Sequence, residues 1–189
     1  NGPGGEFPAI FQKPGQVPQV LCAQGVAPAG ATIAHYTSEG LDSVPGSGLL
    51  ATVVPGAFDG WMRMLHDHGT KRLRDVLEPA IYYARHGHPV LPRVSHTIKG
   101  LADFFHTEWP SSADVWLQGG QCPSAGELFA NPVLADMWER LLSEAEGAKT
   151  RTAQINSARR IWREGFVAEA IDQFVQENAV MDASGERHK

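Results

Sequence analysis

The chain has 189 residues, of which 42% are hydrophobic and 20% are charged, and its formal net charge at pH 7 is -5. This is the composition of an ordinary globular protein with a sizeable core, and the negative charge argues against binding to nucleic acid or to an anionic membrane surface. No apolar run approaches the roughly 20 residues that would cross a bilayer.

The start of the chain is rich in glycine, proline and short apolar runs. Residues 7–12 and 17–23 predict two short strands, and Pro14-Gly15 between them predicts the turn of a β-hairpin. A loop-like stretch of small residues follows. β-Branched residues at 51–54 predict one more strand.

Helical spacing replaces this pattern from Pro55 onward. Gly69 and Gly87 fall where the first two helices should end. The sequence therefore predicts a strand-containing portion over residues 1–54 and a mainly helical portion over residues 55–189. Apolar residues recur three and four positions apart, which predicts helices over about residues 57–68, 73–86, 92–108, 132–146 and 152–178.

Prolines mark other helix boundaries. Pro92 can begin a helix at its first position, and Asn131-Pro132 supplies an N-cap followed by such a proline. Pro79 lies within a helical pattern, so it must either begin a new helix or kink the existing one.

The residues by themselves do not form a catalytic set. The opening NGPGGE lacks the spacing of a dinucleotide-binding loop, and no G-x-S-x-G motif occurs. The stretch VPGAFDGW, residues 54–61, places Pro-Gly before a helix, where free N–H groups could bind an anion. No Lys-Ser or Lys-Thr follows it, so it is no Walker loop, and the alternative is a close-packed helix start that needs small residues.

Two histidine pairs, His66 with His68 and His86 with His88, have the same spacing of two positions. Residues two positions apart on a helix diverge by about 200°, so neither pair converges on one metal ion. Both pairs fall at predicted helix C-termini, where a charged imidazole is favoured by the helix dipole. We therefore expect no metal site.

The cysteines and the chain ends leave alternatives open. Cys22 and Cys122 could form one disulfide or remain two free thiols. The chain begins with Asn1 rather than Met and ends in the polar stretch DASGERHK, which suggests a processed product or part of a longer polypeptide. The compartment, cytoplasmic or exported, stays undecided.

Three segments, taken in order, resemble the γ-glutamyltranspeptidase family. The first is APAGAT at residues 27–32, which follows the predicted strands and the GPGGE turn. The second and most specific is VPGAFDGWMRMLHDHGTKRLRDVLEPAIYYARHGHPV at residues 54–90. The third combines LFANPVLADMWERLLSEAEG with REGFVAEAIDQFV. Together they cover nearly the whole chain and resemble the middle of the family's large subunit, and they make VPGAFDGW a structural helix start.

The resemblance implies an α+β fold. The chain would be part of the αββα sandwich of an N-terminal nucleophile (Ntn) hydrolase, with residues 1–54 supplying strands and residues 55–189 a helical large-subunit subdomain. Such enzymes are heterodimers made by autoproteolysis of one precursor, and they include the γ-glutamyltransferases of glutathione metabolism.

The resemblance also implies how such an enzyme works. A Thr at the new N-terminus of the small subunit attacks an amide, forms an acyl-enzyme and passes the acyl group to water or to an amino acid, as a hydrolase or a transferase. No Thr in this chain can take that role, so we expect the catalytic residue to lie outside it. The implied partners are the remainder of the precursor with its small subunit and a small-molecule amide or peptide substrate. No metal or organic cofactor is implied.

One position departs from the family pattern. Members that bind the α-carboxylate of glutamate carry Arg-Glu shortly before the A-P motif, where this chain has Gln24-Gly25. Gln24 cannot form the bidentate charged pair that Arg makes with a carboxylate, although it could bind an amide or a neutral acyl group. We therefore predict that Gln24 contacts substrate and that the acyl group need not be γ-glutamyl. The alternatives are that Gln24 merely ends a strand, and that the protein is a noncatalytic homologue serving as a binding or structural module.

Overall fold

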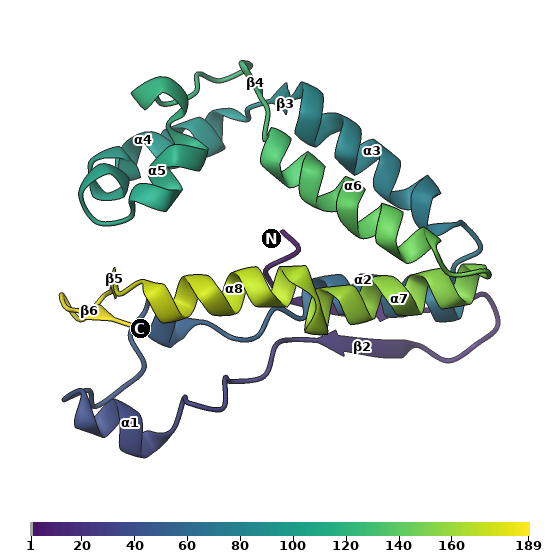
Figure 1. Ribbon diagram of the computed structural model, residues 1–189, viewed down its shortest axis with the longest axis horizontal. Coiled ribbons are helices and arrows are strands. Elements are labelled where there is room, and N and C mark those ends of the chain that lie inside the picture. The colour runs from purple at the N-terminus through teal and green to yellow at the C-terminus, as the bar shows by residue number, and fades with distance from the viewer. Residues whose placement is uncertain (1) are drawn as a thin grey trace. The chain divides into compact units, whose positions relative to one another are not determined.

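The computed structural model describes residues 2–189, and the chain divides into two units (Figure 1). The first unit holds the residues up to Lys71 together with Ala145–Lys189, and the second unit is Arg72–Glu144. The boundary that the sequence predicts between residues 54 and 55 falls within the first unit. The assignment of the two predicted portions to parts of a larger enzyme stays a prediction.

The first unit combines short strands with helices. Its elements in chain order are β1 (Phe7–Phe11), β2 (Gln19–Ala23), α1 (Ile33–Ser38), the 3₁₀ turn η1 (Leu49–Ala51), α2 (Ala57–His68), α7 (Arg151–Glu164), α8 (Phe166–Glu177), β5 (Val180–Met181) and β6 (Arg187–His188).

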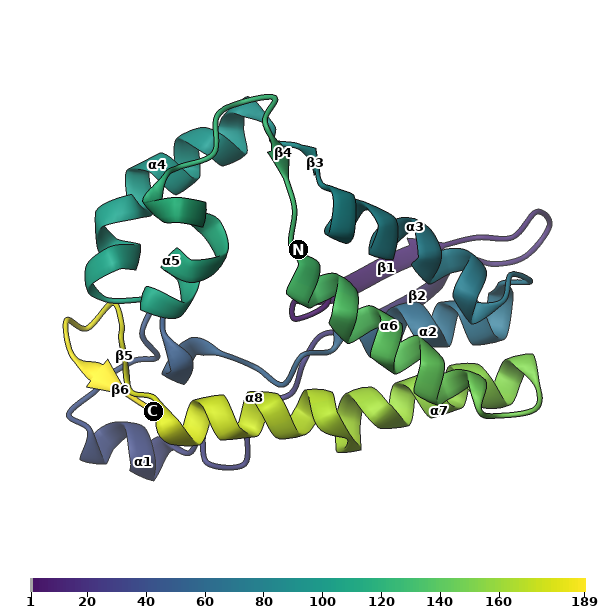
Figure 2. The ribbon, with the colours of Figure 1, turned by 45° about the horizontal axis from the view of Figure 1, so that its top comes forward.

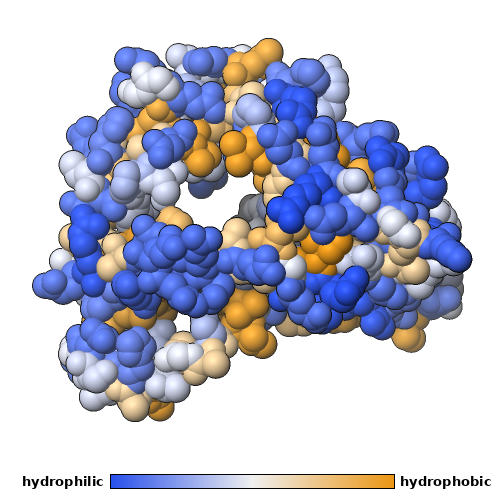
Figure 3. All heavy atoms as spheres, in the orientation of Figure 1, coloured by the Kyte–Doolittle hydropathy of each residue, from blue (hydrophilic) through white to orange (hydrophobic). Residues whose placement is uncertain are grey.

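The predicted hairpin is confirmed. β1 and β2 pair antiparallel, with Phe7 opposite Ala23 and Phe11 opposite Gln19. Gly15 in the connecting turn has a φ of 74°, a left-handed conformation that favours glycine. The hairpin leaves Ile10 and other large apolar side chains exposed, and Figure 3 shows apolar surface interrupting the polar surface on one face of the molecule.

Packing between helices forms the core of the first unit. α7 and α8 follow one another in nearly one line, and α2 lies beside α7 (Figures 1 and 2). Phe58 of α2 is fully buried, and its ring centroid lies 4.7 Å from that of Trp162 on α7. Burying a side chain of this size contributes about 1.5–3 kcal/mol. Across the hairpin side of α2, Trp61 packs edge-to-face with Phe7 at 6.2 Å.

A guanidinium group secures the C-terminal end of α2. Arg151, the first residue of α7, donates hydrogen bonds to the carbonyl oxygens of Leu65 at 2.6 Å, Gly69 at 2.7 Å and Lys71 at 2.7 Å. These carbonyls lie at or beyond the last turn of α2, where a helix leaves carbonyl groups without intrahelical partners; the Leu65 carbonyl also accepts the Gly69 N–H at 3.1 Å.

Two local expectations are corrected. Residues 51–54 do not form the predicted strand: η1 ends at Ala51, and the next residues run extended, with the Val54 N–H bound to the Val26 carbonyl at 3.0 Å. The stretch expected to be loop contains α1. Near the C-terminus, β5 and β6 pair antiparallel, with Val180 opposite His188.

The C-terminal hairpin is organised by a buried carboxylate. Asp182 accepts hydrogen bonds from the Ser184 N–H at 2.8 Å, from the Ser184 hydroxyl and from His188 Nδ1 at 2.7 Å. A Cβ atom at Gly48 would lie 2.4 Å from the Asp182 Cβ. The hairpin therefore packs against the loop before η1, at a place where glycine leaves room.

The second unit follows the predicted helices closely. Its elements are α3 (Leu73–His86), β3 (His88–Pro89), α4 (Pro92–Thr107), α5 (Pro110–Trp116), the 3₁₀ turn η2 (Gln118–Gly120), β4 (Leu128–Phe129) and most of α6 (Pro132–Glu146).

Helix termini in the second unit follow from the residues found there. Gly87 ends α3 with a φ of 88°, and the Asn131 side-chain oxygen accepts the Leu134 N–H at 2.9 Å, as expected for an N-cap. Pro79 lies inside α3, which continues past it, so the alternative of a new helix at Pro79 is wrong. Side chains of α4, of α5 and of the residue after α5 form a core of their own, made of Ile98, Phe105, Ala113 and Leu117.

No helix over residues 2–189 combines the length and the apolar character that a membrane span requires.

Candidate functional site

The glycine-rich turn at the start of the chain meets the beginning of α2. The Gly5 N–H binds the Gly2 carbonyl at 3.0 Å and closes the turn. The Gly5 carbonyl in turn accepts the N–H of Ala57, the first residue of α2, at 3.0 Å. That N–H is one of those that a helix cannot satisfy internally. The GPGGE turn thus serves the start of α2 rather than leaving this N–H for an anion.

Three glycines allow the end of β2 to approach the start of α2. A Cβ atom at Gly25 would lie 1.9 Å from the Val54 carbonyl oxygen, and one at Gly56 would lie 2.6 Å from the Ala23 carbonyl oxygen. A Cβ at Gly60 would lie 2.3 Å from the Cβ of Ala23. No such distances occur between real side chains and their neighbours, so only glycine fits. VPGAFDGW is therefore a close-packed helix start, as the sequence predicts.

Gln24 lies at this junction, directly after β2. Its side chain is exposed, its Nε2 donates to Glu6 Oε2 at 3.5 Å, and its Oε1 accepts a weak hydrogen bond from the Cys22 thiol at 3.7 Å. These contacts join the residue after β2 to the glycine-rich turn at the start of the chain. That Gln24 contacts substrate stays a prediction.

Sequence reasoning missed Glu6. It is the acidic residue that closes the glycine-rich turn, and it is half-buried immediately before β1. Among residues 2–189 it forms no ion pair, and its hydrogen-bond partner is the neutral amide of Gln24. The sequence shows that Glu6 ends the stretch NGPGGE, which could have drawn attention to it. Its proximity to Gln24 depends on the register of the hairpin and is not visible in the sequence.

The histidines of the two pairs lie near helix ends with separate neighbours. In the first pair, His66 Nδ1 lies 2.6 Å from Asp67 Oδ1, and the His68 ring packs on Phe11 with centroids 4.6 Å apart. In the second, His86 packs on Tyr82. Within the described residues 2–189, no three His, Cys, Asp or Glu side chains are grouped so that they could hold a metal ion.

Both cysteines are free thiols. Cys22 is exposed and Cys122 is half-buried. Cys22 belongs to the first unit, beside Gln24, and Cys122 to the second, where its thiol approaches the Ser95 carbonyl at 3.6 Å.

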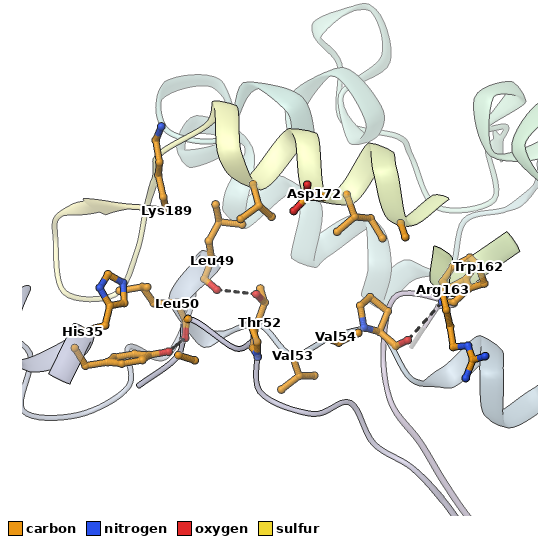
Figure 4. Close-up of a pocket in the computed structure, with 18 residues that line it drawn as sticks. His35, Leu49, Leu50, Thr52, Val53, Val54, Trp162, Arg163, Asp172 and Lys189 are labelled. Carbon is orange, nitrogen blue, oxygen red and sulfur yellow. Dashed lines mark hydrogen bonds between the residues drawn. The ribbon is translucent and has the colours of Figure 1, made fainter. Parts of the chain in front are cut away.

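The first unit also contains an apolar pocket of about 520 Å³ between α8 and the segment that runs from α1 to the start of α2 (Figure 4). Several of its polar side chains form hydrogen bonds to backbone carbonyl groups. The Tyr36 hydroxyl donates to the Leu50 carbonyl at 2.6 Å, and the Trp162 indole N–H donates to the Pro55 carbonyl at 3.4 Å. Asp172 on α8 accepts a hydrogen bond from Gln176 at 2.7 Å. The pocket therefore presents mainly apolar surface and no convergent catalytic set.

Comparison with known proteins identifies the family. The family model described as Gamma-glutamyltranspeptidase matches residues 1–184. The chain is 32% identical over 126 residues to the Glutathione hydrolase-like YwrD proenzyme of Bacillus subtilis (strain 168), an alignment that covers 66% of this chain and 24% of that protein.

Solved structures show the same relationship. The structure of LmbA2991T421A superposes with a TM-score of 0.96 and 54% identity, covering 100% of this chain and 32% of that chain. The cephalosporin acylase from Bacillus halodurans superposes with a TM-score of 0.79 and 26% identity, covering 94% of this chain and 32% of that one.

These matches settle the fold and the family. The chain spans about a quarter of the matched YwrD proenzyme and about a third of the two solved chains. The predicted fold class is confirmed: the chain is an α+β part of the Ntn-hydrolase fold, mostly helical with short strands. The chain belongs to the gamma-glutamyltranspeptidase family.

Proposed function

We propose that the chain is a large-subunit portion of an Ntn amidohydrolase or acyltransferase whose Thr nucleophile lies outside it. The carrying observation is the match of the family model to residues 1–184, supported by likeness to proteins named as a glutathione hydrolase-like proenzyme and a cephalosporin acylase. Both names describe hydrolases. Residues 2–189 bring no reactive set of side chains together, which agrees with a nucleophile supplied by another segment.

The proposed reaction is amide cleavage through an acyl-enzyme. The Thr hydroxyl oxygen attacks the acyl carbon, the C–N bond breaks, and the leaving amine takes up the hydroxyl proton through the catalytic base. Water or an amine then attacks the ester, the acyl–oxygen bond breaks, and the Thr hydroxyl is restored. In this proposal the present chain supplies the scaffold and, through Gln24, one wall of the acyl site.

The partner in this proposal is the remainder of the same precursor, including the small subunit. The YwrD relative is named a proenzyme, which supports processing of a precursor. The exposed apolar residues of the β1–β2 hairpin and the apolar pocket beside α8 offer surface for the remaining polypeptide.

The test uses the full-length protein that contains this chain. We expect a denaturing gel to show two subunits, and N-terminal sequencing of the smaller one to begin with Thr. Replacing that Thr by Ala should leave an uncut precursor and abolish p-nitroaniline release from acyl p-nitroanilides.

The second candidate function is that of a noncatalytic homologue. The observation that favours it is Gln24, which stands where the family pattern has Arg. This candidate predicts an uncut chain that releases no p-nitroaniline from any acyl donor. Either self-cleavage to a Thr N-terminus or turnover of any acyl p-nitroanilide would contradict it.

A further inference from the structure

Glu6 and Gln24 form a polar pair at the junction of the glycine-rich turn, β2 and α2. The carboxylate of Glu6 lies 3.5 Å from the amide nitrogen of Gln24. The Gln24 amide is exposed, whereas Glu6 is half-buried between the turn and β1. The pair therefore presents hydrogen-bonding groups to solvent at this junction.

The pair is negative overall. Among residues 2–189, no Lys, Arg or His forms an ion pair with Glu6, and Gln24 carries no charge to balance the carboxylate. A carboxylate brought against Gln24 would meet the negative charge of Glu6 without a counter-ion. An ammonium group at the same place would be attracted to it.

We propose that Glu6, held by Gln24, sets acyl-donor specificity, favouring acyl groups with a cationic distal end and disfavouring those with a distal carboxylate. This inference rests on the proposed function, in which Gln24 lines the acyl site. A charge pair about 5 Å apart at a protein surface changes the interaction by about one to two orders of magnitude in rate or affinity. The expected effects are therefore large enough to measure.

The alternative role for Glu6 is purely structural. In that case its hydrogen bond would only hold the end of β2 near the glycine-rich turn, and replacing it would change the turnover of every substrate by the same factor. Ratios between substrates of different charge separate the two roles.

The experiment compares kcat/KM of the processed full-length protein for acyl p-nitroanilides that differ only at the distal end of the acyl chain. Butanoyl carries no charge there, 4-aminobutanoyl carries an ammonium, glutaryl carries a carboxylate, and γ-glutamyl carries both. We expect the wild type to prefer 4-aminobutanoyl to butanoyl and to disfavour glutaryl, each by about tenfold or more.

The Glu6→Gln variant removes the charge and keeps a hydrogen-bond acceptor for Gln24. We expect the ratio of 4-aminobutanoyl to butanoyl turnover to fall about tenfold and the ratio of glutaryl to butanoyl to rise. The Gln24→Arg variant should raise the ratio of glutaryl to butanoyl turnover further. The matched control is Glu169→Gln, which removes one negative charge from the exposed surface of α8 and should leave all ratios unchanged.

The outcomes separate the inference from the proposed function. Turnover with a wild-type preference for glutaryl or γ-glutamyl, or equal ratios in Glu6→Gln and wild type, would overturn the specificity role and leave the amidohydrolase proposal standing. An uncut precursor that cleaves none of the p-nitroanilides would overturn both.

Discussion

Arg159 on α7 and Asp59 on α2 form a bidentate ion pair across 100 positions of sequence, with Nε–Oδ1 and Nη2–Oδ2 distances of 2.7 and 3.0 Å. The hydrogen bonds to Asp59 raise the pKa of Arg159. Both side chains are partly buried, so the geometry is held by packing as well as by charge. The pair fixes the register of α2 against α7.

Breaking this pair should destabilise the full-length protein. We expect Arg159→Met to lower the free energy of unfolding by about 1–3 kcal/mol, because it leaves a partly buried carboxylate without its partner. Urea denaturation measures the effect. Arg163→Met, which removes an exposed pair with Glu164 on α7, is the control and should cost at most about 0.5 kcal/mol. Equal effects of the two substitutions would contradict the assignment.

Gly60 should tolerate no side chain even though it lies inside a helix. Alanine normally stabilises a helix interior by about 1 kcal/mol relative to glycine, and Gly100 in α4, with no atom near its would-be Cβ, is the matched control. We expect Gly100→Ala to be neutral or stabilising and Gly60→Ala to destabilise, because its Cβ would strike Ala23. Thermal unfolding of both variants measures the two effects. A Gly60→Ala protein that is more stable than the wild type would contradict the prediction, because it would show that β2 and α2 can move apart without cost.

Arg151 lies on α7, but replacing it should destabilise mainly the C-terminal end of α2. Arg151→Met removes three hydrogen bonds to carbonyls and should cost about 2–3 kcal/mol, with Arg151→Lys recovering part of the loss. Amide hydrogen exchange should show faster exchange in the last turn of α2. Unchanged protection there would rule out the capping role.

The C-terminal hairpin should weaken in acid. Burial alone would raise the pKa of Asp182, but hydrogen bonds from Ser184 and His188 outweigh it and hold the pKa below the usual 3.8. Since the folded pKa is the lower one, the contribution to stability is complete above about pH 4–5 and is lost as the pH falls through the folded value.

The Asp182→Asn variant tests this linkage. Hydrogen exchange of the β5–β6 amides, measured across pH 2–6 with correction for intrinsic rates, should show acid-induced opening in the wild type. The variant should lack this pH dependence. If wild-type protection stays constant down to pH 2, Asp182 does not carry the linkage.

Local signals predicted most of the helices and the first hairpin. Asn131 acts as an N-cap, and Gly87 adopts a left-handed φ at a helix end. Each effect depends on a single position, so it can be predicted without knowledge of the fold. α1 was missed because its six residues bury nothing, although its N-cap was visible: Thr32 accepts the His35 N–H at 3.2 Å. The strand predicted at 51–54 failed because β propensity needs a neighbouring strand, and Val54 finds only the Val26 carbonyl.

The sequence predicted only one of the two residues that form the candidate site. Gln24 stood out because a resemblance supplied an expected arginine at its position. Glu6 did not, because its contact with Gln24 depends on how the hairpin returns the chain to the glycine-rich turn. Interactions of this kind follow from register and turn geometry, which residue spacing alone does not determine.

The first unit is discontinuous in sequence, and this has a consequence for its synthesis. β1, β2 and α2 leave the ribosome before α7 exists, because the whole of Arg72–Glu144 must be translated in between. At about 5–20 residues per second this interval lasts roughly 4 to 15 s. During it the Phe58 face of α2 has no Trp162 to cover it, so the nascent chain must keep that face from aggregating, by local collapse or by chaperone binding, until translation delivers the partner helix.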